Sequence, residues 1–272
     1  MPLTLAHDVY ETSSETARQA TPLLIAHGLL GSRRNWATLA KRFAEHRMVA
    51  TVDLRNHGES PRADSMAYGA MGEDLLAAAE ALFGRPALLL GHSMGGKCAM
   101  AAALTAPSRV AGLIIADIAP AAYDHPEHGR IVAALRSVDL ATLTKRSDAE
   151  PQIAEAIPEP SLRAFLLANL AFTSTQSGRR AHWRAALEEI AANIDLVTGW
   201  PEPLAQSSYD GPAFFLHGGA SDYVGAAERE AIRRAFPRAE IETMPDAGHW
   251  LHAERPDAFY ARVADRLAAL SA

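Results

Sequence analysis

The pentapeptide Gly91-His92-Ser93-Met94-Gly95 constrains this chain more than any other stretch of its sequence. It stands between an apolar run, Ala87–Leu90, that predicts a buried strand and an alanine-rich run, Lys97–Leu104, that predicts a helix. Gly-x-Ser-x-Gly between a strand and a helix is typical of a sharp turn that exposes a nucleophilic serine. Small residues at positions 91, 95 and 96 would let strand and helix approach closely. The pattern therefore predicts a serine hydrolase with Ser93 at a helix N-terminus, which favours developing negative charge.

The same region also satisfies most of a second motif. Residues Gly91 to Lys97 read Gly-x-x-x-x-Gly-Lys, as in a loop that cradles phosphates. The next residue is Cys98, where such a loop needs a serine or threonine hydroxyl for magnesium. We therefore favour the serine interpretation and keep nucleotide binding as an alternative.

Composition narrows the class of protein. A chain of 272 residues with 49% hydrophobic and 21% charged residues suits one large α/β domain, or one domain with an inserted subdomain. The net charge of −6 argues against a nucleic-acid or anionic-membrane partner. The single cysteine cannot form an internal disulfide, and the first residues lack the basic start and apolar core of a signal peptide. No apolar run reaches the length of a membrane span, so we expect a cytoplasmic enzyme.

Short apolar runs alternate with helical patterns along the chain. The runs predict strands at Leu23–Ala26, Met48–Val52, Ala87–Leu90, Leu113–Ala116, Ala213–Leu216 and Ile241–Met244. Helical patterns occupy Trp36–Glu45, Glu73–Leu82 and Pro256–Leu270. This alternation predicts a mostly parallel sheet covered by helices on both faces, with a core domain formed by residues 1–120 and 206–272.

Residues 121–205 contain no strong strand pattern. Helical patterns occur at Gly129–Val138, Leu162–Leu170 and His182–Ile194, and prolines separate them. We expect a helical cap inserted above the carboxyl ends of the strands, where ligands bind in open α/β sheets. Such a cap would exclude water and shape the pocket. The alternative is a set of ordinary packing helices.

A serine nucleophile needs a base and an orienting carboxylate. His249 follows the last predicted strand, and the chain order Ser, Asp, His is that of an α/β-hydrolase base. Asp117 and Asp222 each follow a predicted strand, and the sequence does not decide between them. His252 lies three residues after His249, but no carboxylate or cysteine at a suitable spacing supports a metal site, so we expect none.

The reaction also requires donors for an oxyanion. One should be the backbone N–H of Met94, the residue after the nucleophile. The second should come from the loop after an early strand, and the stretch from His27 to Ser32 has that position, with the N–H of Leu29 as our choice.

Five sequence blocks in order resemble one family: His27–Ser32 with Asn35-Trp36, Asp53–Pro61, Gly91–Lys97, Asp117–Pro120 and Gly248–Glu254. The chain resembles the α/β-hydrolase superfamily, and within it the small bacterial carboxylesterases and their mitochondrial abhydrolase-domain relatives. The resemblance implies hydrolysis of esters or thioesters without a cofactor. The superfamily's usual acid position indicates Asp222, whereas the closer esterase subgroup indicates Asp117. Within the second block we expect residues 55–57 to hold their loop rather than to react.

We therefore expect a serine hydrolase that cleaves carboxylic esters with short to medium acyl chains through an acyl-enzyme on Ser93. The alternatives are a thioesterase or carbon–carbon bond hydrolase with the same triad, and a catalytically silent protein that binds small molecules. Fold and triad do not name the substrate, and the sequence does not predict the oligomeric state.

Overall fold

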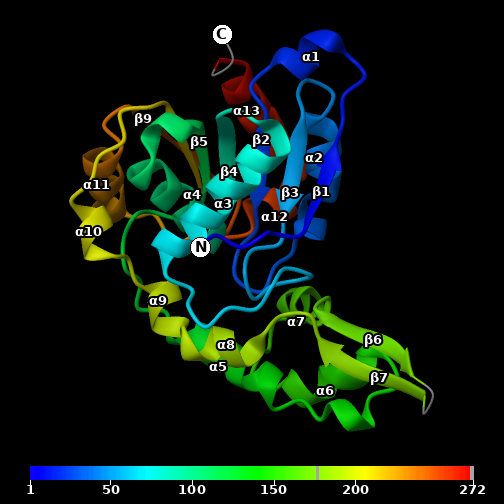
Figure 1. Ribbon diagram of the computed structural model, residues 1–272. Helices are drawn as coiled ribbons and strands as arrows, with labels where there is room; N and C mark the ends of the chain where they lie inside the picture. The colour runs from blue at the N-terminus through cyan, green and yellow to red at the C-terminus, as the bar shows by residue number, and fades with distance from the viewer. Residues whose placement is uncertain (176–177, 270–272) are drawn as a thin grey trace.

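A seven-stranded sheet forms the centre of the computed structural model, which describes residues 1–175 and 178–269 (Figure 1). The strand order is β1-β3-β2-β4-β5-β8-β9, and β1 is antiparallel to β3 while the other pairs are parallel. The strands are β1 (His7–Tyr10), β2 (Leu23–Ala26), β3 (Val49–Val52), β4 (Ala87–His92), β5 (Val110–Ala116), β8 (Ala213–Gly218) and β9 (Ala239–Met244). All six predicted strands are present, and β1 is an edge strand that the sequence analysis did not predict.

Two hydrophobic cores lie on opposite faces of this sheet. Leu24 and Ala26 of β2 belong to one core, whereas Leu23 and Ile25 belong to the other, as expected for side chains that alternate along a strand. The first core includes α3 (Tyr68–Phe83), α4 (Met94–Thr105) and α11 (Ala226–Ala235). The second includes α2 (Ala37–Phe43) and α13 (Pro256–Ala269). Helices on both faces explain why the central strands consist almost wholly of apolar residues.

Several further helices are short. They include α1 (Glu15–Gln19), α6 (Glu150–Ile153), α10 (Glu202–Ala205), α12 (Leu251–Glu254) and the 3₁₀ turns η1 (Arg33–Trp36), η2 (Pro107–Arg109), η3 (Leu140–Thr142) and η4 (Arg146–Ala149). Within residues 1–175 and 178–269, we find no helix with the length and apolar character that crossing a bilayer requires.

The segment between β5 and β8 contains a β-hairpin as well as helices. The patterns expected as three helices correspond to α5 (Pro126–Arg136), α7 (Pro160–Leu167), α8 (Leu187–Ala192) and α9 (Ile194–Thr198). Two antiparallel strands, β6 (Leu170–Thr175) and β7 (Gly178–Trp183), replace the end of the second pattern and the start of the third. The expectation of a cap made of helices alone is thus corrected. In Figure 1 this hairpin projects from the part of the molecule that lies away from the sheet.

Two observations account for the hairpin, one distant in sequence and one local. The side chain of Asn169 donates to the carbonyls of Leu166 and Leu30, at 3.2 and 2.6 Å, and α7 ends there. Along β7 the side chains alternate, so that Ala181 is buried while Arg180 and His182 are exposed. This period of two favours a half-buried strand over a helix.

The strand order places one crevice at the centre of the sheet. Chain connections leave β2 toward β3 on one side and return to β4 on the other. Ligands bind outside the carboxyl ends of the strands at such a point of reversal. The loops after β2, β4 and β5 begin at residues 27, 93 and 117, so the sheet itself brings most of the expected site residues to one edge.

Helices α3 and α4 pack closely at Gly72, and substitution there tests the contact. A Cβ on Gly72 would lie 2.9 Å from the backbone nitrogen of Ala102, whereas a Cβ on Gly69, in the same helix, would meet nothing within 4 Å. We expect Gly72→Ala to lower the free energy of unfolding by about 1–3 kcal/mol through overpacking. Gly69→Ala should raise it by up to about 1 kcal/mol, because alanine favours a helix. Urea denaturation of both variants checks this, and equal effects would contradict the contact.

Candidate active site

Ser93 occupies a strained turn between β4 and α4. Its φ of 52° and ψ of −120° lie in a region that side-chain-bearing residues rarely adopt. Neighbouring glycines make the turn possible, since a Cβ on Gly91 would lie 2.3 Å from the carbonyl oxygen of Gly95. A Cβ on Gly95 would lie 2.5 Å from the carbonyl oxygen of Ala26, in β2. The spacing of small residues in the sequence is therefore a steric requirement of this turn.

A hydrogen bond joins the expected base to one of the two candidate acids. Nδ1 of His249 lies 2.7 Å from Oδ2 of Asp117, and the same carboxylate accepts the Gly218 N–H at 2.8 Å and the Ser221 hydroxyl. Asp117 is 1% exposed and follows β5 directly. Asp222 is exposed. The geometry thus brings Asp117, and not Asp222, to His249.

Burial controls the charge of this pair. Burial, together with the nearby His128 and His125, lowers the pKa of His249 to about 3. Burial raises the pKa of Asp117 to about 6, against the opposing effect of the donors from Ser221 and Gly218. At neutral pH the pair is thus a neutral imidazole beside a carboxylate, with Nδ1–H donating to Asp117 and Nε2 free to accept a proton.

Three contacts to this pair were not anticipated from the sequence. The ring of Tyr223 stacks on His249 with centroids 3.9 Å apart and planes at 16°. Nε2–H of His92 donates to the backbone carbonyl of His249 at 2.8 Å, which fixes the histidine loop to the elbow. The Ser221 hydroxyl donates a hydrogen bond to the Asp117 carboxylate. Ser221 and Tyr223 flank Asp222, so two contacts to the pair come from the loop that holds the other candidate acid.

Ser93 and His249 line one cavity of about 240 Å³ at this edge. Its apolar wall includes Leu29 and Leu30 from the core and Ile131, Leu162, Phe165 and Leu166 from α5 and α7. The loop after β2 lies against the elbow, since a Cβ on Gly28 would be 3.3 Å from Cβ of Ser93. Leu29, which follows Gly28, lines the same cavity as Ser93.

The comparisons with known proteins agree with this arrangement. A model of the α/β hydrolase fold family matches residues 21–256. The chain belongs to the α/β hydrolase family. The predicted fold class and the predicted hydrolase activity are thereby confirmed.

Individual relatives of this α/β hydrolase are similar over most of their length. The "sn-1-specific diacylglycerol lipase ABHD11" of Mus musculus is 38% identical over 253 residues, which cover 90% of this chain and 80% of that protein. "Esterase YbfF" of Escherichia coli is 34% identical over 246 residues, covering 90% and 92%. Among solved structures, "Marine microorganism esterase" superposes with a TM-score of 0.88 at 35% identity, covering 97% and 99%. The expected resemblance to bacterial esterases and abhydrolase-domain proteins is confirmed.

Two buried histidines fix the loop that carries Leu29 in this hydrolase. Nε2 of His57 accepts the N–H of Leu30 at 3.0 Å, and its Nδ1–H donates to the carbonyl of Arg55. Nε2 of His27 accepts the N–H of Leu54 at 3.0 Å. Burial lowers the pKa of His57 to about 3, so its ring stays neutral and remains an acceptor. Leu30 has a φ of 58°, and the bond from His57 holds this uncommon conformation in place.

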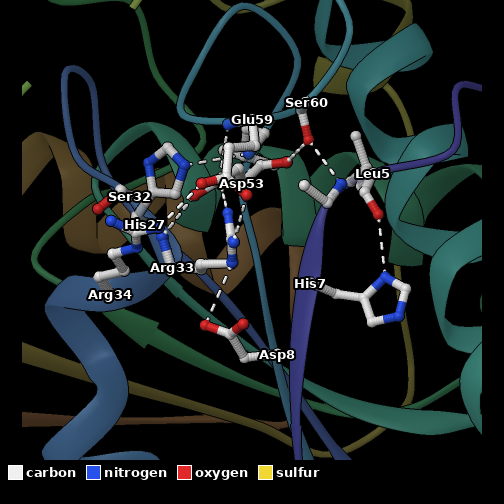
Figure 2. A network of polar contacts seen from close by, with 12 residues as sticks. Leu5, His7, Asp8, His27, Ser32, Arg33, Arg34, Asp53, Glu59 and Ser60 are labelled. Carbon is white, nitrogen blue, oxygen red and sulfur yellow. Dashed lines mark hydrogen bonds and ion pairs between the residues drawn. The ribbon is translucent and has the colours of Figure 1, made fainter. Parts of the chain in front are cut away.

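An ion-pair network anchors the same loop at its far end (Figure 2). Oδ1 of Asp53 accepts the backbone N–H of Arg33 at 2.7 Å, while its Oδ2 pairs with the Arg33 guanidinium. That guanidinium also reaches Glu59 at 2.8 Å and Asp8, on β1, at 3.2 Å. A Cβ on Gly58 would lie 2.0 Å from Oδ2 of Asp53. The network joins the loops after β2 and β3 to the edge strand.

Residues 55–57 hold their loop, as expected from the sequence. The guanidinium of Arg55 pairs with the buried Asp74 at 2.8 Å and donates to the carbonyls of Ser65 and Ala70. The Asn56 side chain bonds both backbone groups of Ala63.

The phosphate-loop alternative does not fit the geometry. Lys97 is 2% exposed, and its ammonium donates to the carbonyls of Thr198 and Gly199 at 2.9 and 2.8 Å. A phosphate-loop lysine must instead reach the bound phosphates. Cys98 is wholly buried. Across residues 1–175 and 178–269, we also find no group of three or more histidine, cysteine or acidic side chains suited to hold a metal ion.

The hydroxyl of Ser221 should tune the charge of Asp117. A donor to a carboxylate favours its ionised form, so Ser221→Ala should raise the pKa of Asp117 above its value of about 6. Ser221→Thr, which keeps a hydroxyl, is the matched control. Carboxyl ¹³C NMR titration measures the effect. An unchanged or lower value in the alanine variant would show that the hydroxyl is not a donor to Asp117.

Proposed function

We propose that this α/β hydrolase is a serine esterase. Relatives named esterases and a diacylglycerol lipase support an ester as the substrate. One observation carries the assignment of the mechanism: Ser93 in its strained turn and His249, hydrogen-bonded to Asp117, line the same cavity. A nucleophile, a base and an orienting carboxylate at the mouth of a cavity are the parts that acyl transfer requires.

The chemistry follows from these parts. The Ser93 hydroxyl attacks the ester carbonyl while Nε2 of His249 takes its proton. The backbone N–H groups of Leu29 and Met94 stabilise the oxyanion of the tetrahedral intermediate. Its collapse expels the alcohol, which receives the proton from His249, and leaves the acyl group on Ser93. Water, activated by His249, then releases the carboxylic acid and restores the serine.

Asp117 acts through the histidine in this proposal. By accepting Nδ1–H, it fixes the tautomer that presents Nε2 to the serine, and it stabilises the imidazolium formed during each transfer. We assign the acid to Asp117 rather than Asp222 because Asp117 is hydrogen-bonded to the imidazole and buried beside it, whereas Asp222 is exposed.

We further propose that residues 121–205 act as a cap on a core formed by residues 1–120 and 206–272. The observation that supports this division is the contribution of α5 and α7 to the cavity wall. A cavity closed by these helices limits the water around the intermediate. Its size and apolar wall suit a small-molecule ester.

Ser93→Ala tests the nucleophile. The variant removes only a hydroxyl, so it should fold, but hydrolysis of p-nitrophenyl acetate should fall to the background rate of the buffer. Wild type and variant are compared in the same spectrophotometric assay, with circular dichroism and thermal melting as controls for folding. Substantial turnover by the folded variant would contradict the role of Ser93.

Asp117→Asn and Asp222→Asn form a matched pair that tests the acid. Asn at 117 offers an N–H to the histidine and favours the wrong tautomer, so kcat should fall by about 10⁴-fold, as in other triads. Asp222→Asn should retain kcat within about threefold, since loss of an exposed charge perturbs the site only weakly. A large loss in the Asp222 variant together with a small loss in the Asp117 variant would reverse the assignment.

A further inference from the structure

We propose that the two halves of the ester occupy separate compartments that meet at Ser93, and that the acyl compartment accepts an acetyl group but not longer acyl chains. This inference rests on the proposed esterase function and specifies its substrate class: acetate esters of bulky, apolar alcohols.

Two compartments of unequal size touch Ser93. The larger is the cavity of about 240 Å³ that His249 also lines. The smaller, of about 20 Å³, does not include His249 in its wall and shares His128 and Tyr223 with the larger one. Its other lining residues are Leu29, Tyr68, Ser93, Met94, Lys97, Ile118, Tyr123, Val197 and Thr198. Because about 10–15 Å³ of such space holds one water-sized sphere, the smaller compartment has room for one methyl group.

The stereochemistry of the intermediate assigns each half of the ester. The tetrahedral carbon carries the Ser93 oxygen, the oxyanion, the alcohol oxygen and the acyl substituent. The oxyanion points to the N–H groups of Leu29 and Met94, and the alcohol oxygen must reach His249 to receive its proton. The alcohol therefore extends into the larger compartment, which contains His249. The acyl substituent therefore extends into the smaller compartment.

The floor of the smaller compartment is fixed by hydrogen bonds. The ammonium of Lys97 donates to the carbonyls of Thr198 and Gly199, and the Tyr68 hydroxyl donates to the carbonyl of Val197 at 2.6 Å. These carbonyls belong to the last turn of α9 and the residue after it, where a helix leaves acceptors unpaired. A longer acyl chain would have to break these buried bonds and displace an ammonium group. The compartment therefore cannot lengthen readily.

A third polar group, the hydroxyl of Tyr123, belongs to the same wall. The Tyr123 hydroxyl donates to the carbonyl of Tyr223 at 2.8 Å and accepts the N–H of Ala119 at 2.9 Å. The Lys97 ammonium lies 4.8 Å from the centre of the Tyr123 ring, within reach of a cation–π contact. By contrast, side chains of Leu162, Phe165 and Trp250 give the larger compartment an apolar wall suited to a bulky alcohol.

The test is a crossed series of substrates. In the acyl series, p-nitrophenyl acetate, butyrate and hexanoate keep one alcohol. We expect kcat/KM to fall by about tenfold or more from acetate to butyrate, because a filled pocket rejects added methylenes by at least that factor. In the alcohol series, ethyl, butyl and hexyl acetate, followed by acid release, keep one acyl group. Here kcat/KM should rise with alcohol length.

Matched variants locate the two effects. Ile118→Ala enlarges the smaller compartment, and Ile131→Ala makes the same change in the larger one. The Ile118 variant should raise the ratio of kcat/KM for butyrate to that for acetate by about tenfold. The Ile131 variant should leave this ratio within about twofold and change the alcohol series instead. If an alanine variant does not fold, the corresponding valine substitutions provide a smaller enlargement.

The outcomes separate this inference from the function on which it rests. Hydrolysis that is flat across the acyl series, or that favours hexanoate, overturns the compartment assignment and leaves a serine esterase intact. A change of acyl preference in the Ile131 variant, with none in the Ile118 variant, reverses the two compartments. If the folded protein cleaves no ester at all, the proposed function fails and this inference with it.

Discussion

The close contact of backbone with backbone at the Ser93 turn is the constraint on which the rest of this structure depends. Gly91 and Gly95 lie where a Cβ would meet backbone atoms at 2.3 and 2.5 Å, so β4, β2 and α4 approach as closely as peptide groups allow. This contact forces the unusual backbone of Ser93 and aims α4 at the carboxyl edge of the sheet. Every other part of the site reaches Ser93 because the strands beside β4 end at that same edge.

The sequence predicted those elements whose structure is determined by residues close together in the chain. The central strands are buried on both faces, so their composition alone predicted them, and the glycine spacing predicted the turn at Ser93. Local patterns failed where the deciding contacts are distant. Asp117 and Asp222 both follow strands, and only the pairing of β5 with β8 and the approach of the loop after β9 bring His249 to one of them. The β6–β7 hairpin was missed because Asn169, which bonds the distant Leu30, ends α7 early.

Histidine serves two different purposes around this site. His27 and His57 accept backbone N–H groups and hold loops, whereas His249 is the ring that the proposed mechanism protonates. Burial lowers the pKa of each of these rings, and for His57 and His249 it reaches about 3. The structural rings of His27 and His57 therefore stay neutral beside the ring that the proposed mechanism protonates. Histidine in a sequence suggests catalysis, but two of these three histidines have a structural role.

Arg33, which anchors a loop of the site, and Asp117, which contacts His249, respond to pH in different ranges. Burial alone would lower the pKa of this guanidinium, but its bond to Glu59 and the charges of Asp53 and Asp8 outweigh that effect and raise it further above its already high value. The loop that carries Leu29 is thus anchored by a cation that keeps its charge throughout the accessible pH range. Mild acid titrates Asp117 first. In the proposed mechanism, protonation of Asp117 would therefore weaken the acceptor that orients His249, while Arg33 keeps the charge that anchors the neighbouring loop.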